Sequence, residues 1–365
     1  MSECAELMSK LATLVRKTHP SLDCYTLDRV LSGTMHPTVS RIDAALCTLP
    51  RRSEMDLKGG GKAEWRVYLE EALLKVDKRY YFKETSRFYN TPKSFQIQEI
   101  GKRFGRYTAA GSATFQIVQG VDALVLASSP LAKNGILQVA SQFNFLESKT
   151  PNYTNIIDYL DDHTQGPRAS LGSLAALILR DYCFENRDQN WAFFKESECY
   201  DGGYFMPWKL PEKEQQVLYL RLCAKISSLA ILAQWGFPDV GDYHLLQIFT
   251  AAPSYQDKDI PSPNSYGEKI CTLLVEAQYR AVAQLAAMRS VVSKARVPLH
   301  LTLVGQGAFN NPPSVMKAAF LAVLATVECF DVDVYVHGYS KEDVKKIRGF
   351  MPRDVREMSK YEFFK

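Results

Sequence analysis

The sequence lacks closely spaced cysteines, although it contains eight cysteines in 365 residues. None of them forms a CxxC pair, so their spacing is not that of a zinc site and indicates reduced, mostly buried thiols. No run of about 18 apolar residues occurs, so we expect no membrane-spanning helix. The first residues have no apolar stretch behind their charges and are not typical of a signal peptide. We therefore expect a cytoplasmic or nuclear protein without a membrane partner.

An excess of charge of one sign is missing too, because 44 basic and 40 acidic residues give a net charge of +4. This balance does not indicate a dedicated nucleic-acid-binding protein, although it allows a small basic patch. The candidate patch is the segment 78–89, where Lys and Arg alternate with Tyr and Phe. Such side chains can stack on a nucleic acid and neutralise it. The alternative is that the rings pack while the charges reach solvent.

The sequence has no internal repeat, and its patterns predict two unequal parts. Residues 1–105 contain short amphipathic helical patterns, so we expect a mainly helical accessory region there. Residues 106–365 contain strand and helix patterns typical of an α/β core. Between about 183 and 296 helical patterns dominate, and Ser265 begins a long helix with a capping box. We therefore expect a large helical insert in the core, with the aromatic residues near its start forming packed core.

The most informative stretch lies near the C-terminal end. Leu299–Val304 is an apolar run typical of a buried strand, and the small-residue loop Gly305–Asn311 follows it. Ser314–Val327 is predicted as a helix with Asn311 as its N-cap, and Val332–Val336 as the next strand. Glycines let a backbone approach a ligand closely, and a helix N-terminus attracts anions, so this unit favours phosphate binding. The alternative is a tight turn before a helix.

A second strand-to-helix junction is predicted earlier in the chain. The strand Ile136–Ser141 leads into a polar segment in which Asn144 is the best candidate for a ligand contact, with Gln142 and Glu147 close by. Ligands of open α/β sheets bind at the carboxyl ends of strands. The loop 165–168 then precedes the apolar helix 171–182 and offers a second helix N-terminus. Together the two junctions could hold a diphosphate from both sides, although Asn144 could equally be a turn residue that bonds its own backbone.

Asp161, Asp162 and His163 allow two interpretations. Carboxylates beside an imidazole can bind a divalent metal or act as acid and base. Acidic residues just before a helix also complement its dipole. Adjacent side chains point in different directions on most backbones, so we expect no metal site and no bound cofactor.

The loop G-x-G-A-F-N-N-P, set between a strand and a helix, resembles the last βαβ unit of the macrodomain superfamily, the ADP-ribose-binding fold. The resemblance implies an α/β fold, a macrodomain-like mixed sheet flanked by helices, with ADP-ribose or a related nucleotide diphosphate as ligand. Gln306 and Asn310 depart from the usual residues of the loop, and the usual triple glycine before Pro167 is missing. The ligand-binding residues that it implies are Ser141, Gln142, Asn144, Gln165, Gly166, Pro167, Arg168, Gly305, Gln306, Gly307, Ala308, Phe309 and Asn310.

The function stays open between alternatives at this stage. The distant glycohydrolase branch of the superfamily also adds helices to its core, so the resemblance implies an ADP-ribosyl hydrolase acting on an ADP-ribosylated macromolecule. Glu147 is then the first candidate for the catalytic carboxylate and Asp162 the second, although the double glutamate of poly(ADP-ribose) glycohydrolases is missing. The second alternative is a non-catalytic reader of ADP-ribose, and the third a nucleic-acid-associated protein that uses residues 78–89.

Overall fold

A computed structural model describes most of the chain beyond residue 92 and short segments before it. The described residues are 27–32, 73–76, 79–82, 93–121, 123, 126, 129–147, 190, 192–194, 197–236, 245–256, 258–351 and 355–364. Within these ranges, none of the helices combines the length and the apolar character needed to span a bilayer.

An eight-stranded sheet forms the centre of the molecule, in the order β12-β4-β11-β10-β5-β9-β8-β3. The six strands from β12 to β9 are parallel, and β8 is antiparallel to both of its neighbours, so the sheet is mixed. The strands are β3 (Lys93–Gln96), β4 (Thr114–Gln119), β5 (Ile136–Ser141), β8 (Ala230–Gly236), β9 (Leu245–Ala251), β10 (Val297–Leu301), β11 (Val332–Gly338) and β12 (Arg356–Ser359). Separate two-stranded hairpins are β1 (Leu73–Val76) with β2 (Arg79–Phe82) and β6 (Tyr200–Asp201) with β7 (Tyr204–Phe205).

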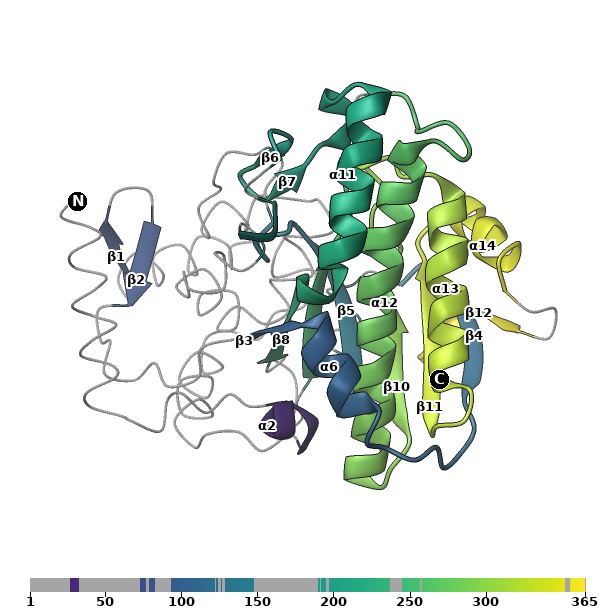
Figure 1. Cartoon of the computed structure of the whole chain (residues 1–365). Helices are drawn as coiled ribbons and strands as arrows, with labels where there is room; N and C mark the ends of the chain where they lie inside the picture. The colour runs from purple at the N-terminus through teal and green to yellow at the C-terminus, as the bar shows by residue number, and fades with distance from the viewer. Residues whose placement is uncertain are drawn as a thin grey trace, which may run out of the picture.

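Helices cover one face of this sheet. Figure 1 shows α12 and α13 side by side in front of β10 and β11, and their many mutual contacts agree with that view. The helices are α2 (Leu27–Ser32), α6 (Ile97–Phe104), α11 (Glu212–Lys225), α12 (Tyr266–Ser293), α13 (Pro313–Val327), α14 (Lys341–Arg348) and α15 (Lys360–Phe363), with the 3₁₀ turns η3 (Pro130–Ala132), η5 (Pro207–Lys209) and η6 (Ile226–Ser228).

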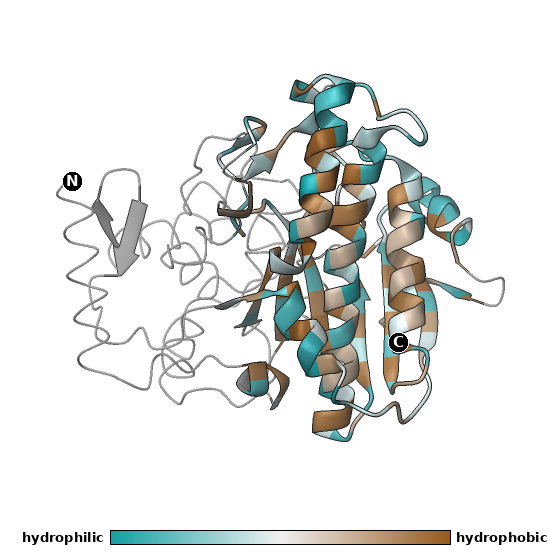
Figure 2. Cartoon of the chain, viewed as in Figure 1, coloured by the Kyte–Doolittle hydropathy of each residue, from teal (hydrophilic) through white to brown (hydrophobic). Residues whose placement is uncertain are grey.

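The main hydrophobic core lies between the sheet and these helices. It combines side chains of β5, β10 and β11 with those of α12, α13 and α14. A second cluster lies on the opposite face and includes Phe363 of α15. Figure 2 shows the corresponding pattern, with hydrophobic residues along the strands and hydrophilic ones on the outward turns of α6 and α14. The inner strands β5 and β9 are buried along almost their whole length because both of their faces are covered, so they lack the alternation of a half-exposed strand.

Several predicted elements are confirmed. α13 and β11 match the predicted helix and strand closely, and β5 has the predicted bounds. Ser265 caps α12 through a hydrogen bond from the Glu268 N–H to its hydroxyl (3.2 Å), and Ser340 begins α14 with a full capping box. These elements carry strong local signals, namely polar caps before amphipathic or apolar runs.

The expected helical insert at 183–296 is wrong in one important respect. This range contains β8 and β9, which are inner strands of the main sheet. β9 is buried along its whole length, and a fully buried strand cannot be told from a buried helix by periodicity. The apolar pattern of Ala123–Ala127 predicts a strand, and this prediction is wrong, because the described residues Ala123 and Leu126 are helical.

The described parts of residues 1–105 do not form the separate helical region that the sequence predicts. β3 lies in this range and pairs with β8 in the main sheet, and residues 73–76 form a strand where a helical pattern is predicted. α6 follows β3 directly and packs on α12. A boundary at residue 105 would therefore divide the sheet from one of its own strands.

Candidate functional site

Three loops leave the carboxyl ends of adjacent parallel strands and meet at one edge of the sheet. They follow β5, β9 and β10, which are neighbours in the order β10-β5-β9. In a parallel sheet these ends lie on the same side, where open α/β folds bind their ligands. Two of the three loops, 142–147 and 302–312, are those that the sequence predicts as site segments. The third, 252–259, is not predicted.

The loop after β10 is shaped by two glycines with different roles. Gly305 has φ +85°, and a Cβ there would lie 2.6 Å from the Cβ of Ala252, so only glycine fits without a shift. Gly307 is exposed, and a Cβ there would meet no atom within 4 Å. The first glycine is thus needed by the fold, whereas the second leaves open space above the loop.

The side chain of Gln306 holds this loop to the start of α13. Its Nε2 donates to the carbonyl oxygens of Asn311 (3.0 Å) and Pro312 (3.2 Å). The amide of Gln306 therefore has a local structural role in the conformation seen here. Asn310 has φ +50°, in the left-handed region where asparagine is tolerated, and the Asn310 N–H donates to the Gly307 carbonyl (3.0 Å).

The loops after β9 and β10 are joined by three hydrogen bonds. Asn311 Nδ2 donates to the Pro253 carbonyl (2.7 Å), the Tyr255 N–H donates to the Phe309 carbonyl (2.9 Å), and Asn310 Nδ2 donates to the Lys258 carbonyl (3.1 Å). These bonds fix residues 253–258 against residues 309–311. The two loops therefore form one rigid unit, which we call the paired loops.

The β6–β7 hairpin connects the paired loops to Asn144. Asn144 Nδ2 donates to the Gly202 carbonyl (3.0 Å), and a Cβ on Gly203 would lie 2.5 Å from the Asn144 side chain. On the other side of the hairpin, the ring of Tyr204 packs on Phe309 with centroids 5.2 Å apart. Asn144 and Phe309 are thus brought to the same hairpin, although 165 positions separate them.

Asn144 also accepts a hydrogen bond from the Leu146 N–H (3.1 Å), which is the local turn that the sequence offers as its alternative role. Both of its polar groups are therefore engaged in this conformation. Ser141 is similarly engaged, because its hydroxyl lies 3.0 Å from the Gln142 carbonyl. Gln142 and Glu147 are buried, each with 3% of the side chain exposed. A ligand role for these four residues stays a prediction.

The start of α13 differs from the prediction. Pro312 is the N-cap instead of Asn311, and Pro313 at the first helical position has no N–H to offer. The Ser314 hydroxyl contacts the carboxylate of Glu268, which also accepts from the Asn264 N–H (2.5 Å) at the start of α12. A protein carboxylate therefore already lies at the positive end of α13, which weakens this helix as the source of attraction for a phosphate.

The loop itself offers the donors that the helix does not. In the described part of the chain, the main-chain N–H groups of Gly307, Ala308 and Phe309 donate to no protein acceptor. Gly307 and Ala308 are exposed, so these donors are accessible to a ligand. Asn311, only 3% exposed, has an Oδ1 without a hydrogen-bond partner. This edge thus offers unpaired N–H donors on exposed residues, which suit an anionic group, whereas the buried Oδ1 of Asn311 is not accessible in this conformation.

Two residues of this edge were not predicted as site residues. Trp208 donates from Nε1 to the Ser254 carbonyl (2.8 Å), and the ammonium of Lys258 lies 4.7 Å from the centre of the indole ring. Trp208 was expected to be core, and it is only partly buried. Neither residue belongs to a recognisable motif, so only the fold brings them to the paired loops.

The other half of the predicted clamp lies outside the described residues. This applies to Asp161, Asp162, His163, Gln165, Gly166, Pro167 and Arg168. The facing arrangement of the two junctions therefore stays a prediction. Among the described residues, no three His, Cys, Asp or Glu side chains are grouped closely enough to hold a metal ion.

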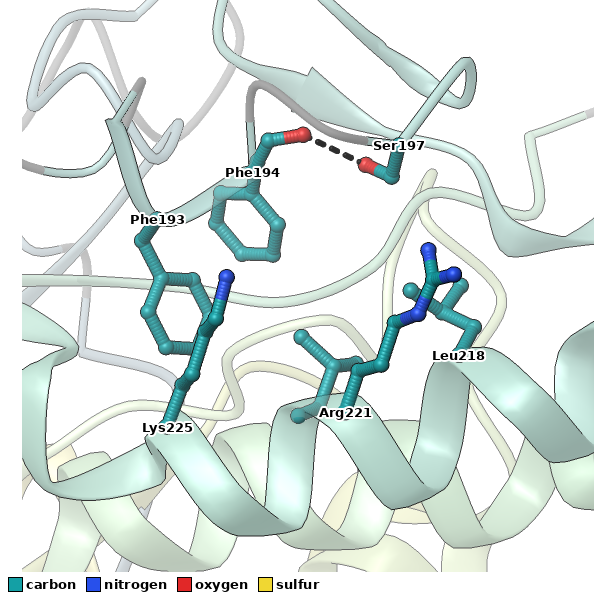
Figure 3. A pocket seen from close by; sticks show the side chains of 7 residues that line it. Phe193, Phe194, Ser197, Leu218, Arg221 and Lys225 are labelled. Carbon is teal, nitrogen blue, oxygen red and sulfur yellow. Dashed lines mark hydrogen bonds between the residues drawn. The ribbon is translucent and has the colours of Figure 1, made fainter.

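A separate recess lies behind this edge, against α11. Figure 3 shows Arg221 and Lys225 rising from α11 toward Phe193, Phe194 and Ser197, which line it. The two phenylalanine rings pack edge to face at 4.7 Å and belong to an aromatic cluster with Phe143 and Phe205. The floor of the recess is therefore packed core, as expected for the aromatic residues of this region.

Comparison with known proteins gives a likeness in structure only. No protein-family model and no curated protein matches the sequence. Similar solved structures include poly(ADP-ribose) glycohydrolase from Deinococcus radiodurans in complex with ADP-ribose, at 11% identity and a TM-score of 0.44, covering 72% of this chain and 95% of that one. A second crystal form of that complex has 12% identity and a TM-score of 0.43, covering 74% and 97%.

The Trypanosoma brucei macrodomain in complex with ADP is also similar, at 11% identity and a TM-score of 0.30, covering 80% of this chain and 97% of that one. These structures come from the superfamily that the sequence motifs resemble. At such low identities and TM-scores, these structures support no conclusion about the ligand or the reaction of this chain. The case for a function therefore depends on the paired loops and their neighbours.

Proposed function

We propose that this protein binds an ADP-ribosyl group at the carboxyl edge of β5, β9 and β10. The observation that carries the proposal is the loop after β10, where unpaired N–H groups from Gly307 to Phe309 lie beside the open space above Gly307. Phosphate oxygens accept such hydrogen bonds, and a glycine without neighbours lets them approach the backbone.

The residues around the loop would orient the rest of the ligand. Phe309 offers an apolar ring beside the hairpin, and Asn144 lies at the other end of that hairpin. In this arrangement the diphosphate lies over Gly307 and the distal ribose lies toward Asn144.

We further propose that bound ADP-ribosyl groups are hydrolysed with Glu147 as the general base. Glu147 lies in the segment after β5, three residues beyond Asn144, and only 3% of it is exposed. A carboxylate in such a place can take a proton from a water that attacks the anomeric carbon of a ribose held at Asn144. The bond from that carbon to the attached group then breaks, and the protonated carboxyl can return the proton to the leaving group. A protein that only reads ADP-ribose would need the loop but not this carboxylate.

Calorimetry with ADP-ribose, ADP and AMP tests the binding proposal, with Gly307→Val as the informative variant. A Cβ at residue 307 meets no protein atom within 4 Å, so we expect an unchanged melting temperature but a loss of ADP-ribose affinity of at least about tenfold, because the diphosphate space is filled. Gly101→Val on α6 is the matched control, since Gly101 is equally open but lies outside the site. No heat with ADP-ribose at high micromolar concentration would contradict the proposal.

Glu147→Gln separates the hydrolase from the reader. If Glu147 is the base, the variant binds ADP-ribose like the original protein but releases none from an ADP-ribosylated substrate. Equal release by both proteins would remove Glu147 from the mechanism and leave the binding proposal intact.

A further inference from the structure

The proposed ligand is negatively charged, but the loop that would bind it supplies no positive charge. A diphosphate brings negative charge, yet the loop from Gly305 to Asn311 contains no charged residue. The nearest helix N-terminus, that of α13, already contacts the carboxylate of Glu268. Among the described residues of this loop, only neutral N–H groups would then face the ligand's charge, and a cation close to them would bind the ligand more strongly.

Lys258 is a cation that the fold fixes to this loop. Its carbonyl accepts from Asn310 Nδ2 (3.1 Å), and its N–H donates to the Tyr255 carbonyl (3.0 Å). Tyr255 in turn is bonded to Phe309, so the backbone of Lys258 moves with the paired loops. Its side chain is exposed, and it forms no ion pair in the described part of the chain.

The ammonium of Lys258 lies on the face of Trp208, which is itself held by the hydrogen bond to Ser254. A cation over an indole at an exposed site is only weakly held, whereas an ammonium beside a phosphate makes a charge-assisted hydrogen bond. The flexible four-carbon stem of lysine allows the ammonium to exchange one partner for the other without a backbone change.

We propose that Lys258 is a ligand-binding residue that leaves Trp208 to pair with the diphosphate of the bound ligand. This inference rests on the proposed function of the site. Trp208 is the resting partner of the ammonium in the free protein, and its indole face becomes uncovered when the ligand binds. The contribution of Lys258 would therefore grow with the negative charge of the ligand, and ADP, whose terminal phosphate carries extra charge, should depend on Lys258 more than ADP-ribose does.

The test is calorimetry with ADP-ribose on the full chain carrying Lys258→Gln, at several salt concentrations. We expect the variant to bind about fivefold to tenfold more weakly and to lose part of the salt dependence of the affinity, because one screened charge pair is removed. Lys360→Gln is the matched control, since Lys360 also lies over an aromatic ring, at 5.3 Å from the centre of Tyr361, but at the far edge of the sheet.

Tryptophan fluorescence gives an independent readout of the exchange. ADP-ribose should change the emission of the original protein, and this change should disappear in Trp208→Phe and in Lys258→Gln. If the original protein binds ADP-ribose and Lys258→Gln binds it with the same affinity and salt dependence, the inference about Lys258 is wrong while the binding proposal stands. If the original protein does not bind ADP-ribose, the proposed function itself fails.

Discussion

Two glycines of one loop show how residues of the same type acquire different roles. In the sequence, Gly305 and Gly307 both predict close approach of a ligand. In the structure, Gly305 has a left-handed backbone and faces Ala252, whereas Gly307 faces open space. The sequence alone cannot make this distinction, because the obstacle at Gly305 comes from the loop after β9, which is 53 residues away.

Gly305→Ala should therefore destabilise the protein, whereas Gly307→Ala should not. The new Cβ at residue 305 would collide with Ala252 and take a strained φ, so we expect the free energy of unfolding to fall by about 2 kcal/mol. At residue 307 we expect a change below about 0.5 kcal/mol. Urea denaturation of both variants measures this difference, and equal stabilities would show that the loop relaxes around the added methyl group.

At the scale of elements, the N-termini of α12 and α13 share one carboxylate. Glu268 lies in the first turn of α12, accepts from the Asn264 N–H and contacts the Ser314 hydroxyl in the first turn of α13. Both helices place partial positive charge at that end, so a single negative charge stabilises both. Glu268 thus connects the N-termini of α12 and α13, the two longest helices of the described chain.

Glu268→Gln should lower the free energy of unfolding by about 1 kcal/mol, since it removes a charge from two helix termini. Glu276→Gln on the same helix is the control, because Glu276 forms only an exposed pair with Arg280 and should change stability by less than half as much. Thermal denaturation at low and high salt measures both. A loss no larger than that of the control would show that the shared carboxylate is not stabilising.

The elements that the sequence predicts well are those with local signals. The cap at Ser265 and the capping box at Ser340 mark α12 and α14, and the run after Pro312 marks α13. β8 and β9 were missed because both of their faces are buried, which removes the alternation that identifies a strand. The site residues show the same dependence on local signals. The loop after β10 has a recognisable pattern, whereas Lys258 and Trp208 reach it only through contacts between distant segments.

At the scale of the whole molecule, a buried histidine pair lies on the sheet face opposite α12 and α13. His300 of β10 and His337 of β11 approach with Nδ1 and Nε2 3.0 Å apart, and Phe363 of α15 packs on both rings. Burial lowers the pKa of His300 to about 4 and lowers the pKa of His337 well below its usual value, with the neighbouring His300 adding to the second shift. Both rings are therefore neutral in the folded protein at neutral pH.

The pair should make the protein sensitive to mild acid. An unfolded histidine takes up a proton near pH 6.5, whereas folded His300 resists protonation until about pH 4 and the pKa of folded His337 is also lowered well below 6.5. Between these values the unfolded state binds more protons, so stability falls as the pH falls, by at most about 1.4 kcal/mol per pH unit for each histidine. Denaturation between pH 7 and pH 4.5 measures the slope, and replacing both histidines with leucine should flatten it. An unchanged slope would assign the acid sensitivity to other groups.

The mixed sheet also has a consequence for how the chain can be divided. β3 comes from residues 93–96, lies at the end of the sheet and covers the apolar strand β8. A shorter chain beginning at residue 106 would keep the pairing of β8 with β9 but would expose the other edge of β8, where Ala230–Ala233 pair with β3. An uncovered strand without charges recruits strands from other molecules. β3 therefore protects the protein from self-association. We expect a C-terminal part without β3 to aggregate, so ligand binding should be measured on the full chain.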